Sequence, residues 1–250
     1  MPSTHDILPV VAAAGELLLS YGAEVTRVED TVTRIARAYG IPEVGTFATP
    51  TGLIVSLGTE HHLTIVRRVR QRTISLDRVS ALNALSREMA VSPLPPDEVL
   101  SRIRAIETLP PPFPAWMDPL FSGLSAAAAT MLVGGALRDF VPALLANALV
   151  QGVQRLSRWL HFPDSIGDFI AGATAVFCAL ALNTLLGSEL IPVIAGGIMI
   201  LLPGTAFTTS VRDAMAGDLL SAGSRALEAT LKAAALAAGV ASALYLTGRL

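Results

Sequence analysis

Apolar stretches in the second half of the chain constrain its fold more than any other feature. Each stretch is close to the ~20 residues that a helix needs to cross the hydrocarbon core of a bilayer. The sequence therefore predicts an α-helical membrane protein with four or five transmembrane helices. The expected spans cover about residues 119–137, 140–156, 166–186, 190–207 and 227–246, of which the second and fourth fit least well.

The distribution of charge separates this half from the rest of the chain. Of the 38 Lys, Arg, Asp and Glu residues, 24 lie in residues 1–118 and 14 in the longer remainder. Charged side chains are costly in lipid, so we expect a soluble α+β domain over residues 1–115 and a transmembrane domain over residues 116–250. The formal net charge of −2 argues against a nucleic-acid partner, which would need a basic surface.

Periodic patterns predict the elements of the first domain. Apolar residues at helical spacing indicate helices over residues 7–20, 24–39, 76–89 and 97–107. Runs rich in β-branched residues, separated by turn residues, indicate antiparallel strands over residues 46–49, 52–57 and 62–67. Five prolines and Trp116 interrupt any regular pattern between residues 109 and 119, which predicts a stiff linker that reaches the membrane surface.

Arginines in the short loops predict the orientation in the membrane. With the N-terminus inside, Arg155, Arg158, Arg212 and Arg225 fall on the cytoplasmic side and only Arg138 falls outside. Positive residues favour the cytoplasmic side. The N-terminal sequence also lacks the pattern of a cleaved signal peptide. We therefore expect an inner-membrane protein with a cytoplasmic N-terminal domain and an external C-terminus.

The sequence Pro203-Gly204 interrupts the fourth apolar stretch near its end. A broken helix in a membrane is tolerated only where protein or water satisfies the freed backbone groups, and such breaks often mark a transport site. Gly204 and Thr205 are therefore candidate substrate-binding residues. The alternative is that Pro203 only ends the helix at the interface.

Arg212, Asp213 and Asp218 follow this break in a predicted loop. A guanidinium matches a carboxylate in two places, so Arg212 is a candidate anchor for an anionic substrate, with Asp213 and Asp218 beside it. The alternative is that Arg212 pairs with Asp213 or Asp218 and only stabilises the loop.

Polar residues also lie inside the apolar stretches. Asn147 and Gln151 are one helical turn apart, and Asn183 lies in the third stretch. Such groups are expected to face the interior of a helix bundle, where Asn147 and Asn183 are candidate pathway residues. Hydrogen bonds between helices are the alternative. Asp168 lies near the start of its stretch and is expected to be solvated.

Signatures of catalysis and of metal or cofactor binding are missing from the sequence. It contains no Ser-His-Asp, P-loop or dinucleotide-binding pattern, and its single cysteine, Cys178, lies in an apolar stretch. His61-His62 is more often a solvated turn than a metal site. We therefore expect no enzyme activity, no cofactor and no catalytic or metal-binding residues.

Three segments carry a resemblance to a known family. GAEVTRVEDTVTRIARAYG, FATPTGL and AGGIMILLPGTAFTTSVRDAMAGDLLSAGSRALEA together resemble the threonine/serine exporter family. The resemblance runs along nearly the whole chain. The positions that match the family's motifs are Gly22, Glu24, Arg27, Glu29, Thr49, Pro50, Gly52, Pro203, Gly204, Arg212, Asp213, Gly217 and Asp218.

The resemblance implies a subunit of a secondary exporter. Family members occur as one long chain with about ten spans or as a split pair, and this chain resembles the larger subunit of the split form. That form is associated with export of dicarboxylates such as succinate, and the fused form with threonine and serine. The implied partners are a small membrane subunit, corresponding to the missing C-terminal half, and further copies of this chain. The alternative function is a membrane-anchored ligand sensor or scaffold without transport activity.

Overall fold

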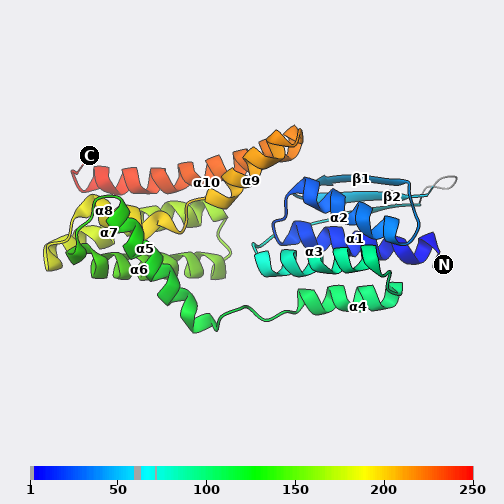
Figure 1. Ribbon diagram of the computed structural model, residues 1–250. Helices are drawn as coiled ribbons and strands as arrows, with labels where there is room; N and C mark the ends of the chain where they lie inside the picture. The colour runs from blue at the N-terminus through cyan, green and yellow to red at the C-terminus, as the bar shows by residue number, and fades with distance from the viewer. Residues whose placement is uncertain (1–2, 59–62, 71, 250) are drawn as a thin grey trace. The chain divides into compact units, whose positions relative to one another are not determined.

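The computed structural model describes residues 3–58, 63–70 and 72–249. The chain divides into two compact units, drawn in Figure 1. The first unit contains Met1–Pro110 and Phe207–Ala226, and the second contains Pro111–Ala206 and Leu227–Leu250. The sequence suggested a single division near residue 115. In space, residues 207–226 pack with the N-terminal elements.

The first unit is built of helices and one small antiparallel sheet. Its strands have the order β1-β2-β3, and Thr49 pairs with Gly52 across a two-residue turn. All four predicted helices and the three strands are found, although residue 62 lies outside the described residues. The elements are α1 (Thr4–Ser20), α2 (Val25–Ala38), β1 (Val44–Thr49), β2 (Gly52–Leu57), β3 (Leu63–Arg68), α3 (Leu76–Val91) and α4 (Pro96–Glu107).

Large apolar side chains form the core of this unit. Leu53, Val55 and Leu57 are buried, whereas the intervening Ile54 is 40% exposed, as expected for a strand with one face on the core. Helix α1 is buried nearly all round because it packs on α2, α4 and the sheet. Pro9 lies inside α1, beyond its first turn, so the helix lacks the backbone hydrogen bond that an amide at this position would donate.

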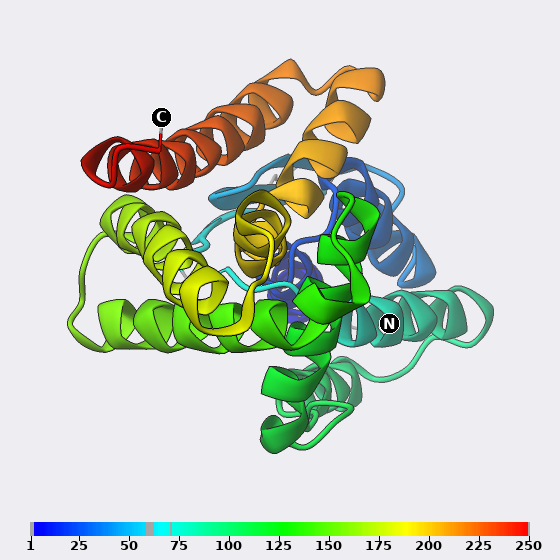
Figure 2. The ribbon, with the colours of Figure 1, turned by 90° about the vertical axis from the view of Figure 1, so that its left-hand side faces the viewer.

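The second unit is helical. A short 3-10 turn (Ala115–Met117) leads into α5 (Asp118–Leu132), and a second (Leu137–Asp139) precedes α6 (Phe140–Trp159). Helices α7 (Asp164–Leu186) and α8 (Leu190–Met199) follow, and α8 packs against α5, α6 and α7 (Figure 2). Helices α9 (Gly204–Met215) and α10 (Leu219–Leu246) contribute residues to both units.

Two of the described helices, α7 and α10, are long and apolar enough to cross a membrane. Helices α8 and α9 are apolar and long enough only as a pair, bent by 61°, which makes them either one broken crossing or a re-entrant loop. This bend confirms the predicted break at Pro203-Gly204. Helix α5 has 15 residues, which at 1.5 Å per residue is shorter than the ~30 Å hydrocarbon core. A membrane protein is therefore supported, while five crossings stay a prediction.

The expected loop after Pro203-Gly204 is wrong, because Arg212 and Asp213 lie on helix α9. No residue between Thr205 and Ala216 breaks a helix, and Gly217 is the first that turns the chain. Its φ of +90° lies in the left-handed region that glycine adopts at low cost. The corner between α9 and α10 is therefore shorter than the sequence suggested.

Candidate functional site

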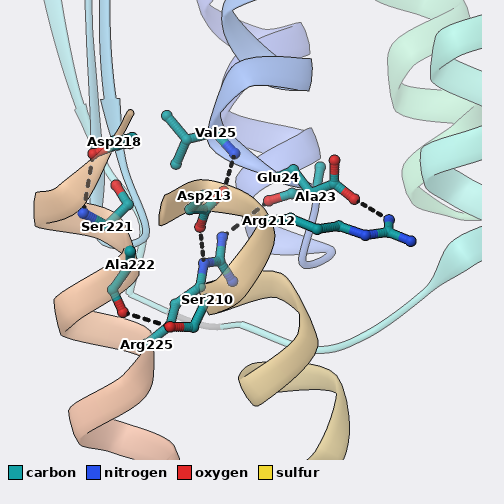
Figure 3. Close-up of polar contacts among 10 residues, drawn as sticks. All are labelled: Ala23, Glu24, Val25, Ser210, Arg212, Asp213, Asp218, Ser221, Ala222 and Arg225. Atoms are coloured by element: carbon teal, nitrogen blue, oxygen red, sulfur yellow. Dashed lines mark hydrogen bonds and ion pairs between the residues drawn. The ribbon is translucent and has the colours of Figure 1, made fainter. Parts of the chain in front are cut away.

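Two chain segments far apart in sequence meet in the first unit, as Figure 3 shows. The first is the junction between α1 and α2, where Gly22 has a φ of +82° and Glu24 precedes the first turn of α2. The second is the corner between α9 and α10. Their side chains form a network of ion pairs and hydrogen bonds, which brings together several candidates from the sequence.

A buried ion pair lies at the centre of this network. Asp213 is 1% exposed, and its Oδ2 lies 3.0 Å from Nε of Arg225. The other carboxylate oxygen accepts a hydrogen bond from the Val25 amide at 3.4 Å, and Arg225 Nη2 donates to the Ala23 carbonyl at 3.0 Å. The pair therefore joins the α1–α2 junction to both α9 and α10.

Arg212 makes a second, more exposed ion pair. Its Nη1 lies 2.5 Å from Oε1 of Glu24, while the Arg212 side chain is 66% exposed. Arg27 lies 3.9 Å from the other oxygen of Glu24. Both pairings considered from the sequence, with Asp213 and with Asp218, are wrong among the described residues. Position 24 is distant in sequence, so local spacing gave no signal for it.

Asp218 caps helix α10. Its Oδ1 accepts a hydrogen bond from the Ser221 amide at 3.1 Å, as a residue that precedes a helix does. Ser210 Oγ donates to the Ala222 carbonyl at 2.8 Å and ties α9 to α10. These contacts fix the corner on which Arg212 and Asp213 are presented.

Beside Arg212 lies a cavity of about 450 Å³, here called the arginine cavity. Its lining includes four arginines and three carboxylates, together with hydroxyl and amide groups, and Ala216 is its one apolar residue. Such a lining can bind a carboxylate through guanidinium groups and an ammonium group through the acidic side chains. The lining residues are Glu24, Thr26, Arg27, Asp30, Thr31, Arg34, Asn83, Arg87, Arg212, Asp213 and Ala216.

Glu29 faces the sheet. Its Oε1 accepts a hydrogen bond from the Ala48 amide at 3.1 Å. Burial raises the pKa of Glu29, the Ala48 hydrogen bond opposes this shift, and the nearby Asp218 and Asp30 carboxylates add to it. Glu29 is therefore half-buried against the sheet and is not among the described residues that line the arginine cavity.

Thr49, Pro50 and Gly52 form the turn between β1 and β2. Thr49 Oγ1 donates to the Gly52 carbonyl at 3.3 Å. A Cβ at Gly52 would lie 3.3 Å from the Arg67 carbonyl, so the close approach of β3 favours glycine there. The contacts of this turn are those of a tight hairpin.

Asn147 and Asn183 belong to the second unit, whereas Arg212 belongs to the first. Asn147 Nδ2 donates to Ser122 Oγ at 2.6 Å, and its buried Oδ1 has no hydrogen-bond partner among the described residues. Gln151 donates to the same hydroxyl at 3.3 Å. Asn183 Nδ2 donates to the Ser188 carbonyl.

Three further positions complete the comparison with the sequence. Gly204 and Thr205 form the first turn of α9, within the second unit. The expectation that Asp168 is solvated is wrong: it is 3% exposed and accepts a hydrogen bond from Gln154 at 2.8 Å. The described residues contain no cluster of His, Cys, Asp and Glu that could hold a metal ion, and His61-His62 lie outside them.

Sequence reasoning missed Arg225, Arg34, Asn83 and Arg87 as site residues. Arg225 was counted only as a loop charge, although a lone arginine directly before an apolar stretch is a signal for a buried ion pair. Asn83 and Arg87 lie one turn apart on α3. The spacing of apolar residues along α3 indicated only the face that packs on the core. Their meeting with α2 and α9 depends on contacts that no local pattern encodes.

Comparison with known proteins identifies the family. A family model described as "Putative threonine/serine exporter" matches residues 9–247. The chain is 26% identical over 240 residues to the "Probable threonine/serine exporter" of Mycobacterium tuberculosis, covering 95% of this chain and 45% of that protein. It is 24% identical over 251 residues to the "Threonine/serine exporter" of Corynebacterium glutamicum, covering 96% and 51%.

A third relative is matched along nearly its whole length. The chain is 25% identical over 238 residues to the "Probable succinate transporter subunit YjjP" of Escherichia coli, covering 94% of this chain and 92% of that protein. The chain spans about half the length of the first two relatives. No solved structure matches it. Because the family model covers almost all of the sequence, the chain belongs to the threonine/serine exporter family.

Proposed function

We propose that this chain is a subunit of a secondary exporter that moves small carboxylate-bearing metabolites out of the cell. Family membership supports an exporter role. The names of the three relatives mention threonine, serine and succinate, and each of these compounds carries at least one carboxylate. The shared chemistry favours a site that recognises a small anion or zwitterion.

The observation that carries the proposal is the arginine cavity. Its four guanidinium groups and three carboxylates can receive a zwitterion with opposite charges at each end, or a dianion through two arginines. Its nearly complete lack of apolar lining suits a polar substrate. The cavity lies in the unit that we propose to be cytoplasmic, where a substrate for export would enter.

Arg212 is suited to exchange partners. An exposed ion pair such as that between Arg212 and Glu24 contributes about 0–1 kcal/mol, so a substrate carboxylate can replace Glu24 at little cost. For threonine or serine, the ammonium group would then take Glu24 as its partner. A dicarboxylate offers Glu24 no such group. The buried pair between Asp213 and Arg225 would hold the backbone of the site in place during this exchange.

We also propose the location and the partner. The loop arginines support a cytoplasmic N-terminal unit. The name of the Escherichia coli relative includes the word subunit, and the two exporters have about as much chain again beyond the match. These facts support a second membrane subunit. The sequence has no P-loop for ATP, so coupling to an ion gradient is the simplest energy source.

Arg212→Lys tests the proposed anchor. Lysine keeps the charge but loses the two-point contact with a carboxylate, so we expect efflux to fall roughly tenfold while the amount of protein in the membrane stays constant. The measurement is efflux of labelled threonine and succinate from a deletion strain of the source organism that carries each variant. Arg102→Lys is the matched control, because Arg102 also forms exposed ion pairs in the first unit but does not line the cavity. Unchanged efflux of both substrates would remove Arg212 from the site.

Glu24→Gln separates the two substrate classes. It removes the partner of an ammonium group but leaves the arginines, so threonine efflux should fall while succinate efflux persists or rises. Equal losses would argue that Glu24 only stabilises the fold.

Proteoliposomes that contain this chain alone should be inactive. Robust efflux from them would contradict the need for a partner, and binding without efflux under every condition would favour the sensor alternative.

A further inference from the structure

The first unit contains a second cavity that the proposed export function does not use. It has a volume of about 680 Å³, compared with about 450 Å³ for the arginine cavity. Residues of α1 and α4 form most of its lining, and Arg67, Arg72 and Thr73 contribute beside them. We call it the α1–α4 cavity. None of the described residues lines both this cavity and the arginine cavity.

The α1–α4 cavity has an apolar floor. Ala13 and Leu17 on α1 and Leu100 and Ile103 on α4 line it, and Leu17 and Ile103 also belong to the main hydrophobic core. Among the described residues, no large apolar side chain lines the arginine cavity. The two cavities therefore favour ligands with different side chains.

Opposite charges stand at the rim of the same cavity. Glu16 is the only charged residue between Ile7 and Ser20 of the otherwise apolar helix α1. Its Oε2 lies 3.7 Å from Nε of Arg67, and the two side chains are 39% and 43% exposed. Arg104 and Glu107 on α4 add one charge of each sign, and Arg72 adds a further positive charge. A charge on a core-forming helix is costly, and here it opens into a cavity beside an opposite charge.

We propose that the α1–α4 cavity binds a free α-amino acid with an aliphatic side chain, at a site separate from the arginine cavity. The ammonium group of the ligand pairs with Glu16, and its carboxylate pairs with Arg67. The distance between Glu16 and Arg67 is similar to the distance between the two charged groups of an α-amino acid. The aliphatic side chain lies on Leu17, Leu100 and Ile103. The larger volume accommodates a bulkier side chain than that of threonine or serine.

The position of the cavity gives such a ligand a route to the export site. Ser20 and Tyr21, at the end of α1, line the cavity. Ala23, two residues further on, accepts the hydrogen bond from Arg225, and Glu24 pairs with Arg212. A ligand that shifts the end of α1 would therefore act on the arginine cavity, which makes the site regulatory in character.

Binding to the purified full-length chain tests the proposal without any transport assay. Titration calorimetry in lipid nanodiscs would compare L-leucine with L-threonine and with 4-methylpentanoate, which has the leucine side chain and carboxylate but no ammonium group. We expect L-leucine to bind at least about tenfold more tightly than the other two, because each lacks one of the matched groups. No binding of L-leucine at millimolar concentration would overturn the proposal, and so would equal affinities for all three compounds.

Variants locate the binding. Ala13→Trp should fill the cavity and abolish L-leucine binding, and Glu16→Gln should weaken it roughly tenfold. Ala105→Trp, at an exposed position of α4 that does not line the cavity, should leave it unchanged. L-leucine binding is measured without transport and at residues outside the arginine cavity, so this site can fail while the export proposal stands, and the export proposal can fail while this site stands. Unaltered binding in Glu16→Gln, the mildest of these changes, would place the ligand elsewhere and contradict the proposal.

Discussion

The buried side chains of the two units differ in average size, with more large apolar residues in the first and more alanines in the second. In the first unit, Leu18, Ile35 and Met89 are at most 1% exposed. In the second, the residues at 0% exposure include Ala127, Ala143, Ala171, Ala175 and Ala179. Large side chains of second-unit helices are exposed, among them Leu145, Leu149, Phe177, Leu185 and Leu231.

This difference indicates two solvents. A core of large apolar residues is what the hydrophobic effect produces in water. In lipid that effect gives no reason to bury leucine, and helices associate through small residues that let backbones approach closely. A Cβ added at Gly172 would overlap the Leu236 carbonyl, and one at Gly239 would overlap the Phe169 carbonyl. Helices α7 and α10 thus each use a glycine to pack closely on the other's backbone.

The largest effect that we predict concerns the buried ion pair of the first unit. Arg225→Met leaves the Asp213 carboxylate buried without its cation, which should cost about 3–5 kcal/mol of unfolding free energy. Thermal unfolding of the purified variants measures this. The double variant Asp213→Asn/Arg225→Met should recover much of the loss. A double variant as unstable as Arg225→Met would show that the lost packing of Arg225, and not the unpaired charge, is responsible.

A matched pair of truncations tests the two cores directly. Ile35→Ala creates a cavity in the first unit, where Ile35 is 0% exposed, and should cost about 2–5 kcal/mol. Leu231→Ala removes a side chain that is 56% exposed in the second unit and should cost less than about 1 kcal/mol. Both are measured by thermal unfolding in the same nanodiscs. Similar losses of unfolding free energy at the two positions would contradict the difference between the two cores.

Substitutions of two glycines on helix α10 test the close packing of α7 and α10 in the second unit. Gly239→Ala forces a methyl group against the backbone of α7 and should cost about 1–3 kcal/mol. Gly223→Ala places its methyl group more than 4 Å from every non-neighbouring atom of the described residues and should stabilise the helix by up to about 1 kcal/mol. Opposite shifts in melting temperature are therefore expected from the same substitution on one helix. A gain in stability at both positions would rule out the close packing of α7 and α10.

The smallest effect concerns Glu29 and pH. Burial raises the pKa of Glu29 above its ordinary value of 4.5, so the folded state binds a proton more tightly than the unfolded chain. Stability from this group is therefore full below pH 4.5 and declines as pH rises through the raised pKa. Glu29→Gln, which can still accept the Ala48 hydrogen bond, should remove this decline.

Melting temperatures measured from about pH 4 to pH 7 check this. The variant should melt about 2 °C or less above wild type at neutral pH and show no advantage at the acidic end. Parallel curves across the range would mean that Glu29 titrates alike in both states.

Local patterns in the sequence predicted much of the fold but less of the site. The helices and strands of the first unit followed from apolar spacing, and the break at Pro203-Gly204 followed from the chemistry of proline in a span. Helix α9 was missed because the Pro-Gly break and the charges at Arg212 and Asp213 indicated a loop. The contact between Glu24 and Arg212 joins residues 188 positions apart, which no periodicity reports.

The candidate residues in the second unit show the other limit. Asn147 was chosen because a polar group in an apolar stretch must find a partner, and it does donate to Ser122. Its remaining oxygen has no partner among the described residues, a detail that depends on the packing of α5 and α6. Composition indicated that the position matters, but only the arrangement of neighbouring helices reveals what it contacts.

The central claim is that the first unit lies in cytoplasmic water and the second in lipid, and site-directed labelling tests it most directly. After Cys178→Ser, single cysteines replace Val66, which is 69% exposed in the first unit, or Phe177, which is 50% exposed in the second. A charged, membrane-impermeant maleimide is then applied to intact cells and to inside-out vesicles. Modification of position 66 only in inside-out vesicles, and of position 177 in neither preparation, is the predicted result. Modification of position 66 in intact cells, or of position 177 in either preparation, would contradict it.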